Sequence, residues 1–309
     1  MPKTMTPPPG VHFLERGWLS SNNILLVDQD QAVLIDTGYY SHAYQTLDLV
    51  KHHLNGRPLT AIINTHLHSD HCGGNAVLQA AFPNANATTW VPPGHAPFVR
   101  QWDALALGYI GTGQHCPPFI SHNSLRVGQE FLIGGHAWQC FAAPGHDPHS
   151  FILFSPDTGI CITADALWEN GFGVVFPEIE GEEGFADVSA SLDLIESLKP
   201  SVIFPGHGSP FTDVAGALTR ARSRLTRFIE HPESHAVYAA KVLVKFKLLE
   251  LQRIKRSAFS NWAMTATHLE KLHHSYPRGL SFENWFEFIC NDLVRSKAAE
   301  IAGDYLVNA

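Results

Sequence analysis

The chain is organised around one short stretch, Thr65-His66-Leu67-His68-Ser69-Asp70-His71-Cys72-Gly73-Gly74. Three histidines and one aspartate fall within six positions of it, directly after the apolar run at residues 61–63, which is typical of a buried strand. Imidazole and carboxylate groups are the ligands that borderline divalent metals accept in proteins. Four such residues packed so tightly cannot all face one ion, so the spacing indicates two metal ions.

Composition places the chain among soluble globular proteins. It has 309 residues, of which 45% are hydrophobic and 16% charged, enough for one large or two ordinary domains. No apolar run approaches the roughly 18 residues of a membrane span, so we expect no membrane partner. The proline-rich start lacks a signal-peptide core, and residues 1–10 are expected to be a flexible lead. Five scattered cysteines favour a reducing compartment, which predicts a cytoplasmic protein.

Charge is distributed unevenly along the chain. The net charge is −8, yet residues 220–256 hold ten basic residues against three acidic ones. Such asymmetry can mark an anionic partner or substrate. A solvated helical face is the explanation that we favour.

Strand and helix patterns alternate in the first two thirds of the chain, which predicts a layered α/β domain at residues 11–212. We expect strands at 11–14, 23–27, 32–35, 60–64, 87–91, 125–127, 130–133, 137–142, 151–154, 160–163 and 201–204. Helical patterns cover 41–54, 74–81 and 188–198. Residues 92–124 and 168–187 are irregular and rich in aromatic residues, so they could form a lid or pocket wall, or, for the first, an ordinary core cluster.

No strand pattern remains after residue 212, which predicts a helical C-terminal domain at 213–309. Its helices are expected at 214–229, 235–257, 268–272 and 282–296. The helix at 237–254 is apolar on more than one side, because Phe246 and Leu249 point roughly opposite Val244 and Leu251. It is therefore expected to be buried against the main domain or a partner chain, and a homodimer through these helices is possible.

Further ligand-type residues recur where predicted strands end. Asp36 and Asp165 each close a strand, and His146 and His207 lie in two separate Pro-Gly-His turns. Strand ends of one sheet lie near one another, so these groups can converge on the opening stretch. His149, three residues after His146, is expected either to pack near the site or to have no chemical role.

The pattern His-x-His-x-Asp-His, followed by a distant histidine, an aspartate and a last histidine, resembles the signature of the metallo-β-lactamase superfamily. The match covers about residues 11–211, and all seven ligand positions are filled in order. The resemblance implies a four-layer αββα sandwich with the metals at one edge of two sheets. It is closest to the glyoxalase II, lactonase and ribonuclease branches, which use a bridging aspartate.

The resemblance also implies the ligand sets. One metal would be bound by His66, His68 and His146. The second would be bound by Asp70, His71 and His207, with Asp165 bridging both ions. Asp36 matches an aspartate of the family that does not bind metal itself but orients a residue that does. Zinc is the expected metal, and manganese or iron accepts the same ligands.

The chemistry that follows is hydrolysis. Two divalent ions hold a bridging water as hydroxide near neutral pH and stabilise the oxyanion that forms, so no protein nucleophile is required. Asp70 is the expected catalytic residue, because its second oxygen can carry a proton. The expected substrate is an ester, thioester or lactone of a small molecule.

Two other functions remain open. A phosphodiesterase or ribonuclease would bind an anionic substrate through residues 220–256. Nucleic acid is not the favoured partner, because that segment lacks the basic and aromatic alternation that stacks bases. A metal-holding scaffold without activity is disfavoured by the complete ligand set.

Overall fold

Two β-sheets form the centre of the molecule, described by a computed structural model at residues 6–83, 88–275 and 279–309. The first sheet has the strand order β1 (Val11–Leu14), β2 (Asn23–Val27), β3 (Ala32–Ile35), β4 (Ala61–Ile63), β5 (Thr88–Val91) and β6 (Asn123–Ser124). The second has the order β11 (Val202–Pro205), β10 (Ile160–Ala164), β9 (Phe151–Ser155), β8 (His136–Ala142) and β7 (Glu130–Ile133).

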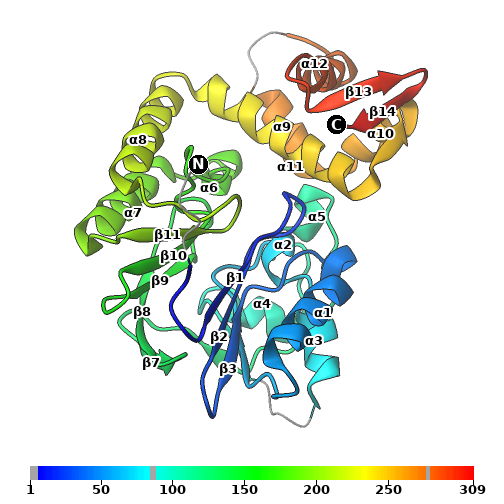
Figure 1. Cartoon of the computed structure of the whole chain (residues 1–309). Coiled ribbons are helices and arrows are strands. Elements are labelled where there is room, and N and C mark those ends of the chain that lie inside the picture. Colours follow the sequence, from blue (N-terminus) through cyan, green and yellow to red (C-terminus); the bar gives the residue numbers. More distant parts are fainter. Residues whose placement is uncertain (1–5, 84–87, 276–278) are drawn as a thin grey trace.

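Helices cover the outer face of each sheet. In Figure 1, α1 (Ala43–Leu54) and α3 (Asn75–Ala81) lie outside the first sheet, and α7 (Phe185–Leu198) and α8 (Val214–Glu230) lie outside the second. Three apolar clusters fill the spaces between these layers. The predicted four-layer αββα sandwich is therefore confirmed.

The alternation of side chains along each strand explains this layering. In β2, Ile24 and Leu26 join the cluster between the sheets, whereas Leu25 joins the cluster under α1. In β9, Leu153 points between the sheets and Ile152 points toward α7 and α8. Successive strand residues face opposite sides, so strands that are apolar throughout can be buried on both.

Two segments predicted to be irregular contain short helices and buried side chains. Residues 92–124 hold α4 (Ala96–Gln101) and α5 (Tyr109–Thr112), and Tyr109 and Phe119 pack into a core cluster there. Residues 168–187 hold α6 (Phe176–Glu180), preceded by the fully buried Val175. The predicted strand at 125–127 is wrong, because the edge strand β6 precedes it and Val127 is exposed.

The C-terminal region contains helices and also a small sheet, which corrects the purely helical prediction. Its helices are α9 (Pro232–Leu251), α10 (Arg256–Ala263), α11 (Thr267–His274) and α12 (Phe282–Arg295), and its sheet has the order β12 (Arg253–Lys255), β14 (Tyr305–Asn308), β13 (Ala299–Ala302). The helix predicted to run to residue 257 ends at Leu251, because Gln252 adopts a left-handed backbone with φ 60°. Residues 253–255 then pair with β14.

Helix α8 belongs to the sandwich by its contacts, although the sequence placed it in the C-terminal domain. Its buried residues Ala217, Leu218 and Leu225 pack in the same cluster as those of α7. The C-terminal cluster takes most of its residues from Ala236 of α9 onward, joined by Val174 and Ile179. We therefore place the start of the C-terminal unit at α9. Of the predicted lead, residues 1–5 lie outside the described residues, and Gly10 accepts a hydrogen bond from the Val27 amide.

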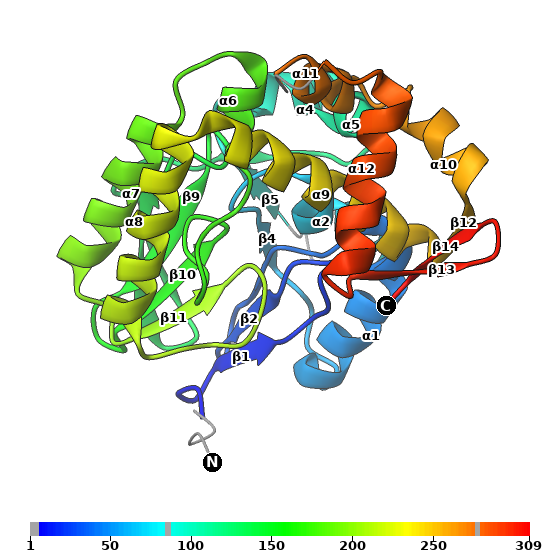
Figure 2. The same ribbon diagram turned by 90° about the horizontal axis from the view of Figure 1, so that it is seen from above.

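Helix α9 is buried on two sides, as its pattern predicted. Val244 and Leu248 pack with Trp285 in the C-terminal cluster. On another side, Phe246 contacts Tyr39 of the sandwich, with the ring centroids 5.1 Å apart. Figure 2 shows α9 lying across the molecule between α8 and α12. In the described parts of the chain, no helix is both long and apolar enough to cross a membrane.

Two leucines on α9 test this packing. Leu248 is fully buried, whereas Leu251, one turn later, is 40% exposed. We expect Leu248→Ala to lower the free energy of unfolding by about 2–5 kcal/mol, because it leaves a cavity. Leu251→Ala should change it by less than about 0.5 kcal/mol. Urea denaturation followed by circular dichroism measures both, and equal losses would contradict the described packing of α9.

Candidate metal centre

The loops that follow four strands bring the predicted ligands together. His66 and His68 follow β4, Asp165 follows β10 and His207 follows β11, while His146 lies in the turn after β8. Asp70 and His71 lie on α2 (Ser69–Cys72). The structure places all seven predicted residues in two groups whose ligand atoms lie within 4.8 Å of one another in each group. The groups are His66, His68 and His146, and Asp70, His71, Asp165 and His207.

The first group is oriented by the main chain. His146 Nδ1 lies 2.6 Å from the carbonyl oxygen of Val174, to which it donates, so Nε2 is left to face the site. That Nε2 atom lies 2.8 Å from His68 Nδ1. His66 is fully buried, and its Nε2 has no hydrogen-bond partner. Three imidazole nitrogens therefore converge from three different directions.

Asp36 orients the second group from behind, in the position predicted for it. Its carboxylate lies 2.7 Å from His71 Nδ1 and accepts hydrogen bonds from the amide and hydroxyl of Thr65. An imidazole that donates its Nδ1 hydrogen to a carboxylate presents the Nε2 lone pair on its other side. Nε2 of His71 indeed faces the site, 3.4 Å from Asp165 Oδ1.

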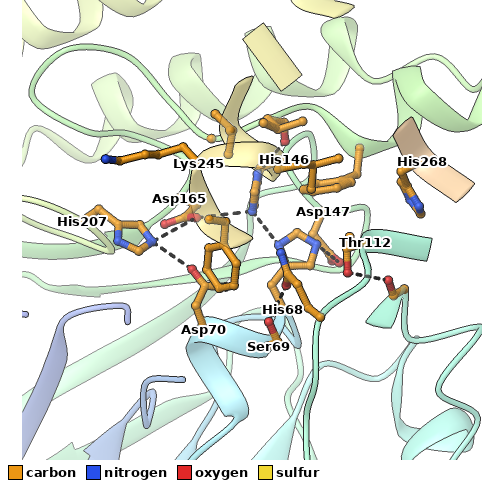
Figure 3. Close-up of a pocket in the computed structure, with 18 of the residues that line it drawn as sticks. His68, Ser69, Asp70, Thr112, His146, Asp147, Asp165, His207, Lys245 and His268 are labelled. Carbon is orange, nitrogen blue, oxygen red and sulfur yellow. Dashed lines mark hydrogen bonds and ion pairs between the residues drawn. The ribbon is translucent and has the colours of Figure 1, made fainter. Parts of the chain in front are cut away.

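Asp165 lies between the two groups. Its Oδ1 is 3.4 Å from His71 Nε2, and its Oδ2 is 3.4 Å from His146 Nε2. Figure 3 shows it between His207 and His146, with Asp70 across the site. The carboxylate is held by a hydrogen bond from Trp168 Nε1, at 3.1 Å. This is the position that a bridging ligand requires.

The backbone accepts local strain to place these side chains. Asp36 and Ala164 adopt left-handed conformations, with φ 58° and 45°. Such conformations are unfavourable for residues other than glycine and cluster at functional sites. Gly206 approaches Asp165 so closely that a Cβ atom there would lie 2.1 Å from Asp165 Oδ1. A glycine is therefore needed at that position in the Pro-Gly-His turn.

The donor set suits divalent cations. Nε2 of His66 and Nε2 of His71 are both buried without a hydrogen-bond partner, a costly arrangement that metal coordination would relieve. Burial and the neighbouring imidazoles hold the pKa of His66 and His68 well below the usual value, so both stay neutral, as ligands must. Burial opposes charge on His71, but Asp165 and Asp36 outweigh it and raise its pKa, so the local field favours a cation.

Asp147 is a contact of the first group that the sequence did not reveal. Its Oδ2 lies 3.7 Å from His68 Nε2 and 3.6 Å from His95 Nε2. Its place directly after His146, in a turn rich in ligand-type residues, was the available signal. His149 packs at the edge of this group, with its ring 4.7 Å from that of His95, and belongs to neither ligand set.

Aromatic rings cover both ends of the site, and two of them, Phe176 and Trp168, belong to the aromatic-rich segment 168–187 that was expected to form a lid or pocket wall. Phe176 of α6 lies over His68, with the ring centroids 4.7 Å apart. At the other end, Trp18 stacks on His207 at 5.3 Å and 7°, and Trp168 meets the same ring edge-on. These rings limit the access of water to the two ligand groups.

The site opens into a pocket of about 1020 Å³. Its floor carries ligand residues of both groups, among them His68, Asp70 and Asp165 (Figure 3). Its opposite wall is formed by α9, through Val242, Phe246 and Leu249. The C-terminal unit therefore encloses the space in front of the site.

Sequence comparison identifies relatives over the sandwich. The sequence model of the Metallo-beta-lactamase superfamily matches residues 16–207. The chain is 24% identical over 205 residues to the probable metallo-hydrolase YqgX of Bacillus subtilis, covering 64% of this chain and 89% of that protein. It is 26% identical over 202 residues to the thioesterase pkgB of Emericella nidulans, covering 65% of this chain but 49% of that protein.

Solved structures share the fold. A beta-lactamase domain protein from Burkholderia ambifaria superposes with a TM-score of 0.62 at 24% identity, covering 88% of each chain. The protein TTHA1623, in a di-iron-bound form, superposes with a TM-score of 0.54 at 26% identity, covering 68% of this chain and 98% of that one.

The role of Asp36 can be tested without removing a ligand. Asp36→Asn keeps the shape of the side chain but removes the charge behind His71, so we expect metal affinity to fall by about 10- to 100-fold. Competition with a chromophoric chelator measures this. Asp157→Asn is the matched control, because Asp157 accepts from His136 at 2.7 Å on the surface, and metal affinity should not change. Unchanged affinity in Asp36→Asn would show that Asp36 has no part in the site.

Proposed function

Because the chain belongs to the metallo-beta-lactamase superfamily, we propose that it is a hydrolase with two divalent metal ions that acts on an ester, thioester or lactone of a small molecule. One observation carries the proposal. Two adjoining ligand groups, with Asp165 between them, open directly onto a pocket with an apolar wall.

The protein's own groups account for the steps around the reacting atoms. Divalent ions held by the two groups would supply an activated water and an electrophile for the carbonyl oxygen. Asp70 directs Oδ2 toward His207 Nε2, at 3.1 Å, and lines the pocket. We assign it the proton of the attacking water, which it can pass to the leaving group. Phe176 and α9 exclude bulk water from the space where the oxyanion forms.

The pocket supports an acyl substrate. Leu107 and Tyr109 line it on the side of the sandwich, and Val242, Phe246 and Leu249 line it from α9. An enclosed apolar pocket with a few convergent polar groups is typical of a small-molecule site. The name of the relative pkgB, a thioesterase of which this chain spans about half, is consistent with a thioester.

The identity of the metal is part of the proposal. Five histidines and Asp70 as ligands, besides the bridging position of Asp165, favour zinc, and manganese or iron would fit the same atoms. The di-iron form of TTHA1623 supports a two-metal site in this fold.

The basic segment gives little support to a nucleic-acid substrate. Arg222 pairs with Asp193 and Glu196 on the surface, and Lys241 pairs with Asp292 at 2.7 Å. Arg256 likewise pairs with Glu287. Cations that are already paired contribute less to phosphate binding, so we retain a small molecule as the proposed partner.

A substrate panel tests the proposed reaction class. Metal-loaded protein is assayed with 4-nitrophenyl esters, thioesters, lactones, bis-4-nitrophenyl phosphate and single-stranded RNA. We expect turnover of at least one acyl class. Turnover of the phosphodiesters without any acyl substrate would overturn the proposal in favour of the alternative.

Two ligand variants test the site within that assay. We expect His68→Ala and Asp165→Ala each to abolish hydrolysis and to lower the bound metal, because each removes a donor atom from a closed set. His231→Ala is the control, since that side chain is exposed and faces Glu233. Full activity with full metal content in either ligand variant would refute the assignment.

A further inference from the structure

Arg224 is a cation in the pocket wall whose charge nothing nearby neutralises. It lies on α8 and lines the pocket together with Asp165, Trp168 and His207. Two other arginines of the same helix are paired: Arg220 with Asp213 at 3.2 Å, and Arg222 with Asp193 at 2.8 Å. Across the parts of the chain that the structure describes, no carboxylate lies within ion-pair distance of Arg224.

The other cations of the pocket are already held by the protein. Lys241 pairs with Asp292, and Lys271 pairs with Glu180. Lys245 donates to the carbonyl oxygens of Ala298 and Ala309 and to the side chain of Asn308. Arg224 therefore differs from Lys241 and Lys271 in having no carboxylate partner, and from Lys245, whose three donors are all used, in retaining free donors.

The guanidinium of Arg224 is held in place by weak contacts. Its Cζ lies 5.2 Å from the centre of the Tyr238 ring, and Nη1 lies 3.5 Å from the carbonyl oxygen of Phe172. A Cβ atom on Gly171 would come within 2.5 Å of Cζ, so the absence of a side chain there makes room for the group. A guanidinium carries five donor hydrogens, and this one long contact leaves most of them available.

Tyr238 adds a neutral hydroxyl beside the guanidinium. Its hydroxyl donates to the Phe172 carbonyl at 3.3 Å, a long hydrogen bond that one to a substrate carboxylate would replace. Burial raises the pKa of this phenol to about 12, although the positive charge of Arg224 opposes the rise. The phenol is therefore protonated at neutral pH.

We propose that Arg224 and Tyr238 form a carboxylate-binding subsite, so that the substrate is an acyl ester or thioester that carries a carboxylate away from the scissile bond; this rests on the proposed hydrolase function. A planar guanidinium matches the geometry of a carboxylate with two parallel hydrogen bonds. A single guanidinium balances one negative charge, which favours a carboxylate over the more highly charged phosphate monoester.

Matched thioesters test the subsite in catalysis. N-acetylcysteamine thioesters of adipate and hexanoate differ by a carboxylate on the acyl side. Hexanoyl thioesters of 3-mercaptopropionate and 1-propanethiol differ by one on the thiol side. Released thiol is measured with a chromogenic disulfide. We expect wild-type protein to prefer the charged member of one pair by about 10- to 100-fold in kcat/KM, mainly through KM.

Variants assign that preference to the pair. Arg224→Gln should bring the ratio of charged to neutral substrate close to one, and Arg224→Lys should retain part of it. Tyr238→Phe should lower it by a smaller factor, because the ring that supports Arg224 remains. Arg222→Gln is the matched control on the same helix and should keep the full preference.

Binding separates failure of the subsite from failure of the proposed function. Adipate and hexanoate are titrated into metal-loaded wild type and Arg224→Gln by calorimetry. One outcome is that wild type binds adipate more tightly than hexanoate, that Arg224→Gln loses this difference, and that no thioester is hydrolysed. That outcome supports the subsite and refutes the hydrolase function. Turnover with no preference for either charged substrate refutes the subsite alone. If Arg224→Gln lowers kcat/KM equally for the charged and the neutral substrates and also lowers thermal stability, Arg224 is a structural anchor for residues 168–173. That result would also refute the subsite.

Discussion

The structure depends on holding the Asp165 carboxylate, with little exposure, between two groups of imidazoles. Removing a carboxylate from water costs several kcal/mol unless nearby charges or hydrogen bonds compensate. Here Trp168 Nε1 donates a hydrogen bond at 3.1 Å, and the Nε2 atoms of His71 and His146 lie 3.4 Å from carboxylate oxygens, so cations bound by these groups would supply the rest of the compensation. The left-handed backbone at Ala164 and the close approach of Gly206 are consequences of fitting that carboxylate between strand ends. The packing of layers on both faces of each sheet stabilises the fold enough to offset this strain.

The C-terminal unit changes what this site can do. A sandwich alone would leave the ligand groups at an open edge, whereas α9 covers that edge and forms the far wall of the pocket. The same helix supplies Phe246 to the sandwich and Val244 to the C-terminal cluster, so its position is fixed from both sides. The residues that we assign to substrate selection, Arg224 and Tyr238, come from α8 and α9, apart from the ligand loops.

The two groups of ligand-type residues were predictable because their signal is local. His66, His68, Asp70 and His71 lie within six positions, and the remaining ligands each close a recognisable apolar strand. The strands at Val11–Leu14, Asn23–Val27 and Ala32–Ile35 were predicted with the bounds observed, since each is a short apolar run between turn residues. The C-terminal hairpin carried a similar signal that was missed: a two-residue Gly303-Asp304 loop joins strands that pair Ala302 with Tyr305.

Contacts between distant segments could not be predicted in the same way. Trp18 reaches His207 and Tyr238 reaches Arg224 through the fold, with no spacing in the sequence that records it.

The central claim, that two ligand groups hold two ions, is tested most directly by elemental analysis of protein purified without added metal and then titrated with zinc. The account predicts two equivalents of divalent metal per chain at saturation. Saturation at one equivalent, or no tight binding, would contradict it.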